Sequence, residues 1–68
     1  MKTFYGVRTK FFDNGKCEVS RLILECKHKP DNINEEHTCF DLYEDWFDNK
    51  VEADRFLNDA LAEGAKVV

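Results

Sequence analysis

The sequence predicts an α+β fold, a three-stranded antiparallel β-meander with one C-terminal α-helix packed on one face (β-β-β-α). Residues 3–12, 17–27 and 38–47 are rich in aromatic and β-branched side chains, as strands are. The turn sequence Asp13-Asn14-Gly15-Lys16 predicts a hairpin between the first two strands. A helical apolar period follows Asn49 and predicts the helix.

The first hairpin allows two registers. A two-residue Asn-Gly turn would set Arg8 directly opposite Arg21, and such a like-charge pair destabilises an antiparallel ladder. A type I turn with Gly15 as the bulge sets Lys10 opposite Glu18 instead. We therefore predict the bulged turn.

The third strand is expected to complete the meander by pairing with the second. Residues 29–36 before it are polar, have no period and contain Pro30, the only proline, so we expect a loop there. The third strand then spans residues 38–47, and its pairing with the second strand would place Cys39 opposite Cys26.

The junction between the third strand and the helix is the sharpest local signal. Asn49 is the predicted N-cap, and Glu52 completes an Asn variant of the capping box. Gly64 supplies a left-handed stop. Residues 65–68 either return as a short fourth strand at a sheet edge or remain a frayed tail. The apolar positions of the helix are Ala53, Phe56, Leu57, Ala60 and Leu61.

One helix can cover only one face of this sheet. We expect the covered face to carry Tyr5, Val7, Phe11, Val19, Ile23, Phe40, Leu42 and Trp46. The opposite face would then expose Phe4, Phe12, Leu22, Leu24, Tyr43 and Phe47, with Asp41 and Asp45 among them. An exposed apolar patch usually marks an interface, so these residues are the predicted partner-binding site. The alternative is that long Lys and Arg stems and the C-terminal tail shield this face.

Length and composition narrow the function classes. The 68 residues form a single domain, 1–68, near the lower limit at which an apolar core suffices, so we expect no enzyme and infer no small-molecule substrate. The sequence has no run of about 20 apolar residues and no leader pattern, and its three cysteines are an odd number for a disulfide scaffold. We expect a cytoplasmic protein without a membrane partner.

Charge is distributed unevenly along the chain, whose net charge is −4. Residues 1–30 hold seven Lys and Arg against three acids, whereas residues 31–59 hold ten acids against two basic residues. This asymmetry serves either the pairing of the two halves or the steering of a charged partner. The acidic half disfavours nucleic acid, so weak binding through the basic N-terminal hairpin is only a further alternative. Its basic and aromatic residues are Arg8, Lys10, Lys16 and Lys27 with Phe4 and Phe12.

A Cys/His constellation is the most specific chemical signal. Cys26 and His28 mirror His37 and Cys39, and if the two cysteines face each other, four N and S ligands cluster at one end of two strands. Such a set suits tetrahedral zinc, although the spacing departs from the usual C-x-x-C and H-x(3–5)-H pairs. We therefore predict no cofactor and keep a zinc-stabilised regulatory domain as the alternative.

Two stretches of the chain carry a resemblance to known sequences. They are Tyr43-Glu44-Asp45-Trp46-Phe47-Asp48, followed by Glu52-Ala53 and Phe56, and the earlier Phe11-Phe12-Asp13-Asn14-Gly15-Lys16. In these the chain resembles short open reading frames of bacterial phages and mobile elements whose activity is uncharacterised. The resemblance implies no activity and no functional residue, and it favours an accessory or inhibitor protein.

The function that the sequence favours is a small non-enzymatic protein–protein interaction domain. It would bind a protein partner, or a second copy as a homodimer, through the open sheet face, through the acidic strand–helix edge, or through both. The zinc-stabilised domain and weak nucleic-acid binding are the two alternatives.

Overall fold

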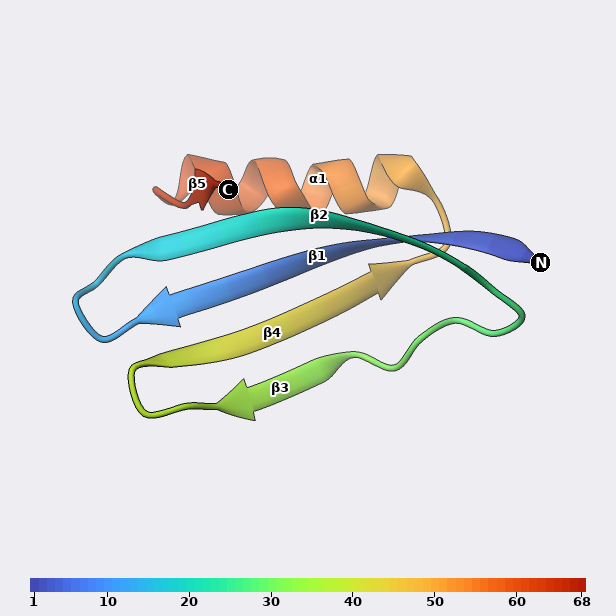
Figure 1. The fold of residues 1–68 in the computed structure, drawn as a ribbon. Helices are drawn as coiled ribbons and strands as arrows, with labels where there is room; N and C mark the ends of the chain where they lie inside the picture. Colours follow the sequence, from blue (N-terminus) through green and yellow to red (C-terminus); the bar gives the residue numbers. More distant parts are fainter.

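The computed structural model describes all of residues 1–68 and shows a five-stranded sheet with one helix (Figure 1). The strand order is β3-β4-β1-β2-β5, and every pair is antiparallel except β2 with β5. The α+β class, the antiparallel pairing and the single helix are confirmed, whereas the strands number five rather than three or four. The elements are β1 (Lys2–Phe12), β2 (Cys17–Cys26), β3 (Ile33–Glu36), β4 (Phe40–Phe47), α1 (Lys50–Ala62) and β5 (Lys66–Val67).

The central strand is β1, so the predicted meander is wrong. β4 pairs with β1 and not with β2, and Val7 therefore lies between Arg21 on one side and Asp45 on the other. The physical reason is burial, because β1 is the most buried strand of the sheet, whereas β2 fully buries only Val19. The most buried strand gains most from a place where both of its edges are paired and both faces are covered.

Residues 29–36 are not a loop throughout, because β3 forms in their second half. All four residues of β3 are exposed, so no apolar period could reveal this strand. His37 N donates to Phe40 O at 2.8 Å and closes the β3–β4 hairpin. Beyond β3, the side chain of Asn32 accepts a 2.9 Å hydrogen bond from Trp46 N, and so ties the β2–β3 connection to β4.

The bulged register of the β1–β2 hairpin is confirmed. Phe12 N donates to Lys16 O at 2.8 Å, and Gly15 has φ of +87°, a conformation that favours glycine. Lys10 lies opposite Glu18, as the charge pattern predicts.

Both predicted ends of α1 are confirmed. The side chain of Asn49 accepts a 2.9 Å hydrogen bond from Glu52 N, and Gly64, with φ of +105°, ends the helix. The chain then returns along β2 as β5, where Val68 N donates to Val19 O at 2.9 Å. Of the two alternatives for residues 65–68, the edge strand is the one that forms.

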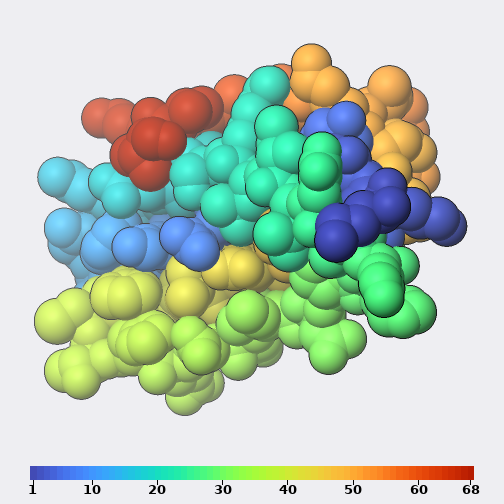
Figure 2. Space-filling model, turned by 45° about the vertical axis from the view of Figure 1, so that its right-hand side comes forward, coloured from blue at the N-terminus to red at the C-terminus, as the bar shows by residue number.

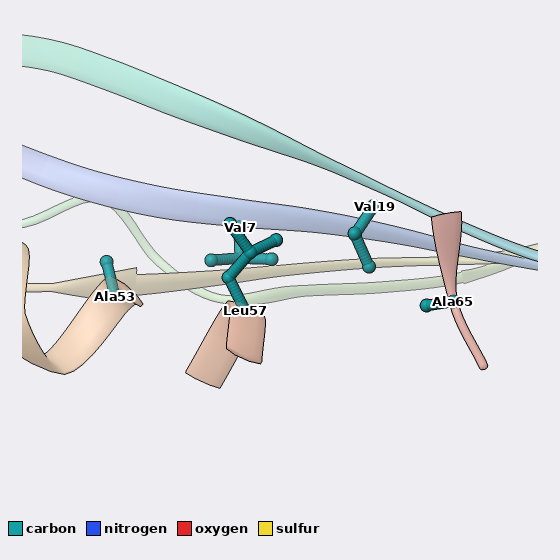
Figure 3. Packing of buried hydrophobic residues seen from close by; sticks show 5 residues of the cluster. All are labelled: Val7, Val19, Ala53, Leu57 and Ala65. Carbon is teal, nitrogen blue, oxygen red and sulfur yellow. The ribbon is translucent and has the colours of Figure 1, made fainter. Parts of the chain in front are cut away.

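The core lies between α1 and strands β1 and β2 (Figure 3). Val7 and Val19 project from the sheet toward Leu57, and these three side chains are the largest that are fully buried. Ala53 and Ala65 complete the cluster, and the short side chain of Ala53 lets the helix lie close to the sheet.

The strand register assigns each side chain to a face, because opposite residues of antiparallel strands point to the same side. The helix-covered face carries Tyr5, Val7, Thr9, Phe11, Val19, Ile23, Asp41, Tyr43, Asp45 and Phe47. The open face, in front in Figure 2, carries Phe4, Phe12, Leu22, Leu24, Phe40, Leu42 and Trp46. The faces predicted for β1 and β2 are confirmed, although Phe11 and Ile23 stay exposed there and do not join the core. The faces predicted for β4 are reversed, since pairing with β1 changes the parity of β4.

Candidate partner-binding groove

A groove of about 420 Å³ lies on the helix-covered face, between α1 and strands β1 and β4. α1 packs mainly on β1 and meets β4 through Phe56 and Phe47, and the space between the C-terminal half of the helix and these two strands is left open. Its volume falls within the range of about 300–1,000 Å³ that is typical of ligand sites. The lining residues are Thr9, Phe11, Tyr43, Asp45, Phe56, Asp59, Ala60 and Glu63.

Aromatic rings form the walls of the groove. Phe11 and Tyr43 meet edge to face, with centroids 5.6 Å apart and ring planes at 80°. Phe56 stands on the opposite wall, on α1, and its ring packs 5.5 Å from that of Phe47. Phe11 is 48% exposed and Phe56 37% exposed, so both offer π-surface to a ligand.

The charged groups of the groove are all carboxylates, those of Asp45, Asp59 and Glu63. None of them belongs to one of the three ion pairs of the structure, and no Lys or Arg lines the groove. The last turn of α1 also lacks a basic residue, so the negative end of the helix dipole is not compensated there. The electrostatic potential of this site therefore favours a cation.

Thr9 provides a buried hydroxyl that lacks a partner. Its side chain is 4% exposed, and its Oγ1 forms no hydrogen bond within the chain. A buried polar group without a partner costs about 1–3 kcal/mol. Thr9 lines the groove, but its Oγ1 is itself shut off from solvent, so a ligand that brings a donor or an acceptor would remove this cost only if the side chain turned toward the groove.

Two pKa shifts reflect the environment at this end of the molecule. Burial raises the pKa of Asp45 above that of an ordinary Asp, so this carboxylate gains from any cation brought beside it. Burial, and then the negative charge of Glu63, raise the pKa of the Cys17 thiol. Cys17 is thus held as the thiol, which is the poorer nucleophile.

The predicted partner-binding residues are divided between the two faces. Tyr43 and Asp45 line the groove, while Asp41 and Phe47 lie elsewhere on the helix-covered face. The prediction that these four belong to the open face is therefore wrong. The other four, Phe4, Phe12, Leu22 and Leu24, do lie on the open face, but Phe4 is buried there, contrary to the prediction, and of the four only Leu24 is exposed.

The predicted partner-binding residues do not include the helical side of the groove. Phe56, Asp59 and Glu63 recur at spacings of three and four, so they share one stripe of α1. This stripe borders the core stripe that Ala53 and Leu57 form. The signal in the sequence that could have revealed this side of the groove is the aromatic and acidic stripe beside the apolar one.

The open face is partly shielded by its own side chains. This agrees in part with the alternative that long Lys and Arg stems cover it. The indole of Trp46 lies across Gly6, and both residues are buried. Arg8 Nη2 lies 2.8 Å from Glu44 Oε2, and Lys10 Nζ lies 5.2 Å from the ring centroid of Phe40.

The basic hairpin is consequently not a free cationic surface. Arg8 is neutralised by Glu44, and Lys10 lies opposite Glu18. In the folded protein, Glu44 from the acidic second half of the sequence thus lies beside Arg8 from the basic first half.

The four predicted zinc ligands do not come together. Cys26 lies opposite Lys2 at one end of the sheet, whereas Cys39 O accepts a 3.1 Å hydrogen bond from Asp13 N at the other end. The expectation that Cys26 faces Cys39 is therefore wrong, with His28 near the first end and His37 near the second. No group of three or more His, Cys, Asp or Glu side chains has a metal-binding arrangement.

Comparison of the chain with protein-family models, with curated proteins and with solved structures found no match. The single helix, α1, is neither long enough nor apolar enough to cross a membrane.

Proposed function

We propose that this protein is a small non-enzymatic interaction domain that binds a basic segment of a partner protein in the groove beside α1. The observation that carries the proposal is the combination of carboxylates without ion-pair partners, exposed aromatic rings and one buried hydroxyl without a partner in a single groove. Following the resemblance of the sequence, the domain serves a phage or mobile element as an accessory or inhibitor protein.

Arginine is the side chain that fits the groove best. Its planar guanidinium stacks on aromatic rings and donates two parallel hydrogen bonds to a carboxylate, whereas a lysine ammonium is a compact, strongly hydrated charge. Stacking on a ring contributes about 0.5–2 kcal/mol, depending on how far the cation is desolvated. Phe11 and Phe56 supply the rings, and Asp45 supplies a half-buried carboxylate.

A protein segment suits the site better than a single small cation, because the acidic surface continues beyond the groove. Asp41 and Asp45 point to the same face of β4, and four residues of an extended strand separate them by about 13 Å. An extended segment with basic residues at matching positions would contact both carboxylates.

The test is a titration of the ¹⁵N-labelled protein with a short peptide that has one central arginine, and with its citrulline twin. Citrulline keeps the shape of arginine but has no charge. We expect amide shifts at Thr9, Tyr43 and Phe56 with the arginine peptide only. Equal binding of the two peptides, or shifts confined to the open face, would contradict the proposal.

Variants separate the groove from general electrostatics. The double substitution Asp45→Asn, Asp59→Asn should weaken binding of the arginine peptide by about tenfold or more, since two nearby carboxylates are lost. The matched control, Asp31→Asn with Asp48→Asn, removes the same charge from exposed positions outside the groove. At physiological salt the control should bind within about twofold of the wild type.

Thr9→Val tests the hydroxyl without a partner. Valine has nearly the same shape, so the fold should keep its stability or gain up to about 1 kcal/mol when the buried hydroxyl is removed. Binding of the arginine peptide should weaken at the same time. If binding is unchanged, Thr9 has no part in ligand recognition.

A further inference from the structure

The outer edge of β2 is mostly unpaired. β1 pairs with all of β2 on one side, but on the other side β5 pairs only with Glu18 and Val19. No strand of the structure lies beside residues 21–26 on that side. An edge of this kind presents free N–H and C=O groups on which another strand can pair.

The backbone groups that point outward can be identified from the β5 contact. Val68 N donates to Val19 O, so the carbonyl of Val19 points away from β1. Backbone direction alternates along an antiparallel strand, and Arg21, Ile23 and Glu25 therefore direct both N–H and C=O to the free edge.

The two edges of the sheet differ in protection. β3, at the opposite edge, is only four residues long and carries the charges of Glu35 and Glu36, which discourage pairing. The free part of β2 carries Ile23, which is 69% exposed, and Leu24, which is 43% exposed. It contains no proline, and its backbone pairs regularly with β1 without a bulge.

We propose that a second copy of this chain pairs with this edge, β2 antiparallel to β2, about a two-fold axis at Ile23. The segment is self-complementary in this register. Arg21 lies opposite the partner's Glu25, and the symmetry repeats this opposite-charge pair. Ile23 lies opposite the partner's Ile23, and Leu22 lies opposite the partner's Leu24.

Neighbouring symmetric registers lack this match. An axis at Leu24 would place Arg21 opposite the partner's Lys27, a like-charge pair, and Ile23 opposite a glutamate. An axis at Leu22 would place Arg21 opposite isoleucine and bring Glu25 to Val19, whose edge β5 already occupies. The charges therefore specify the register at Ile23.

The dimer would be a continuous ten-stranded sheet with both helices on the same face, because the two-fold axis is normal to the sheet. Arg21 Nη1 already lies 3.3 Å from Asp54 Oδ1 within one copy, so the arginine would lie between Asp54 and the partner's Glu25. The groove is lined by β1, β4 and α1, so it stays free in the dimer and the two proposals can fail separately.

Charge reversal tests both the dimer and its register. Arg21→Glu and Glu25→Arg each create two like-charge pairs across the axis, and each should weaken self-association by about tenfold or more. Mixing the two variants puts opposite charges at both pairs again. We expect the mixture to form a heterodimer in light-scattering and sedimentation measurements, while each variant alone stays monomeric at the same concentration.

Lys16→Glu is the matched control, since it reverses a charge at an exposed turn position outside the free edge of β2. It should dimerise as the wild type does, and circular dichroism should show all variants folded. A wild type that is strictly monomeric at about 1 mM overturns the proposal, because the dissociation constant of the dimer would then lie above the millimolar range. So does a mixture that fails to associate, or a dimer that survives both charge reversals but is lost in Leu42→Lys on the open face.

Discussion

Gly6 and Trp46 fit closely against each other across two strands. They lie opposite each other in the β1–β4 pair, and a Cβ at Gly6 would lie 2.9 Å from the indole carbons Cε3 and Cζ3. The absent side chain makes room for the ring, which covers this part of the open face. A glycine in the middle of a strand is thus explained by its neighbour across the sheet.

Gly6→Ala should lower the free energy of unfolding by about 1–3 kcal/mol, the usual cost of overpacking. Urea unfolding followed by the fluorescence of Trp46, the only tryptophan, measures the change. In a Trp46→Leu background the same substitution should cost clearly less, with unfolding followed by circular dichroism. Equal losses in both backgrounds would show that the ring is not the cause.

Asp45 should make stability depend on pH in the direction opposite to a salt-bridged carboxylate. Burial raises its pKa in the folded protein, so the folded state binds this proton more tightly than the unfolded chain. Its ionised form therefore destabilises the fold above the raised pKa, and this cost disappears as pH falls below the ordinary value of about 3.9.

Asp45→Asn removes that cost. It should stabilise the protein at pH 7 and lose this advantage progressively toward pH 3, as paired unfolding curves of variant and wild type would show. Asp31→Asn, at an exposed position, is the control. A difference between Asp45→Asn and the wild type that stays constant over this pH range would contradict the assignment.

Among the elements, α1 is stabilised partly by local hydrogen bonds at its ends and partly by packing on the sheet. Asn49 caps the first turn, and the helix buries only Ala53 and Leu57 against the sheet. With so narrow an apolar contact, the capping hydrogen bond contributes a sizeable share of the stability of the helix.

Asn49→Ala should therefore destabilise the protein by about 1 kcal/mol, within the range of about 0.5–2 kcal/mol for lost caps. Thermal or urea unfolding measures it. Asn49→Asp keeps an acceptor at the N-cap and should retain the wild-type stability. If both substitutions cost the same, the capping hydrogen bond is not what stabilises this end of α1.

The β4 strand shows what pairing decides for an element. Its ends are close to those that the sequence predicts, yet its side chains point to the faces opposite to the expected ones. Tyr43 and Asp45 reach the groove only because β4 pairs with β1. Because β4 has apolar and polar residues on both faces, its sequence does not reveal which face will turn toward the helix.

For the whole molecule, the strand order predicts a gradient of local stability. β1 is paired on both sides and buries Phe4, Val7 and Thr9, whereas β3 is an edge strand without a buried residue. Regions with few buried contacts open most readily.

Amide hydrogen exchange should consequently be slowest in β1 and fastest, among the strands, in β3. Exchange followed by NMR at residue level would show this order. Protection of β3 amides equal to that of β1 would indicate that β3 is held by contacts beyond its pairing with β4.

The uneven distribution of charge along the chain is partly explained by ion pairs between its two halves. Arg8 and Arg21 of the first half pair with Glu44 and Asp54 of the second half, so part of the asymmetry serves internal pairing. The carboxylates of the groove remain without such partners, and that remainder is what the proposed basic segment would bind.

The sequence by itself determined the features that a few adjacent residues decide. The bulge at Gly15, the cap at Asn49, the stop at Gly64 and the helix between them each depend on local backbone preferences and short hydrogen bonds. Such terms act over one turn or one hairpin, so they can be read from the order of residues.

Only the tertiary structure decided the strand order, the existence of β3, the faces of β4 and the groove. The residues that pair between β1 and β4 are 28 to 42 positions apart in the chain, from Phe12 with Phe40 to Tyr5 with Phe47. Their pairing results from competition for the central place in the sheet. That competition depends on total burial and on both faces at once, which no local pattern encodes. Thr9, Asp45 and Asp59 became neighbours as a consequence of its outcome.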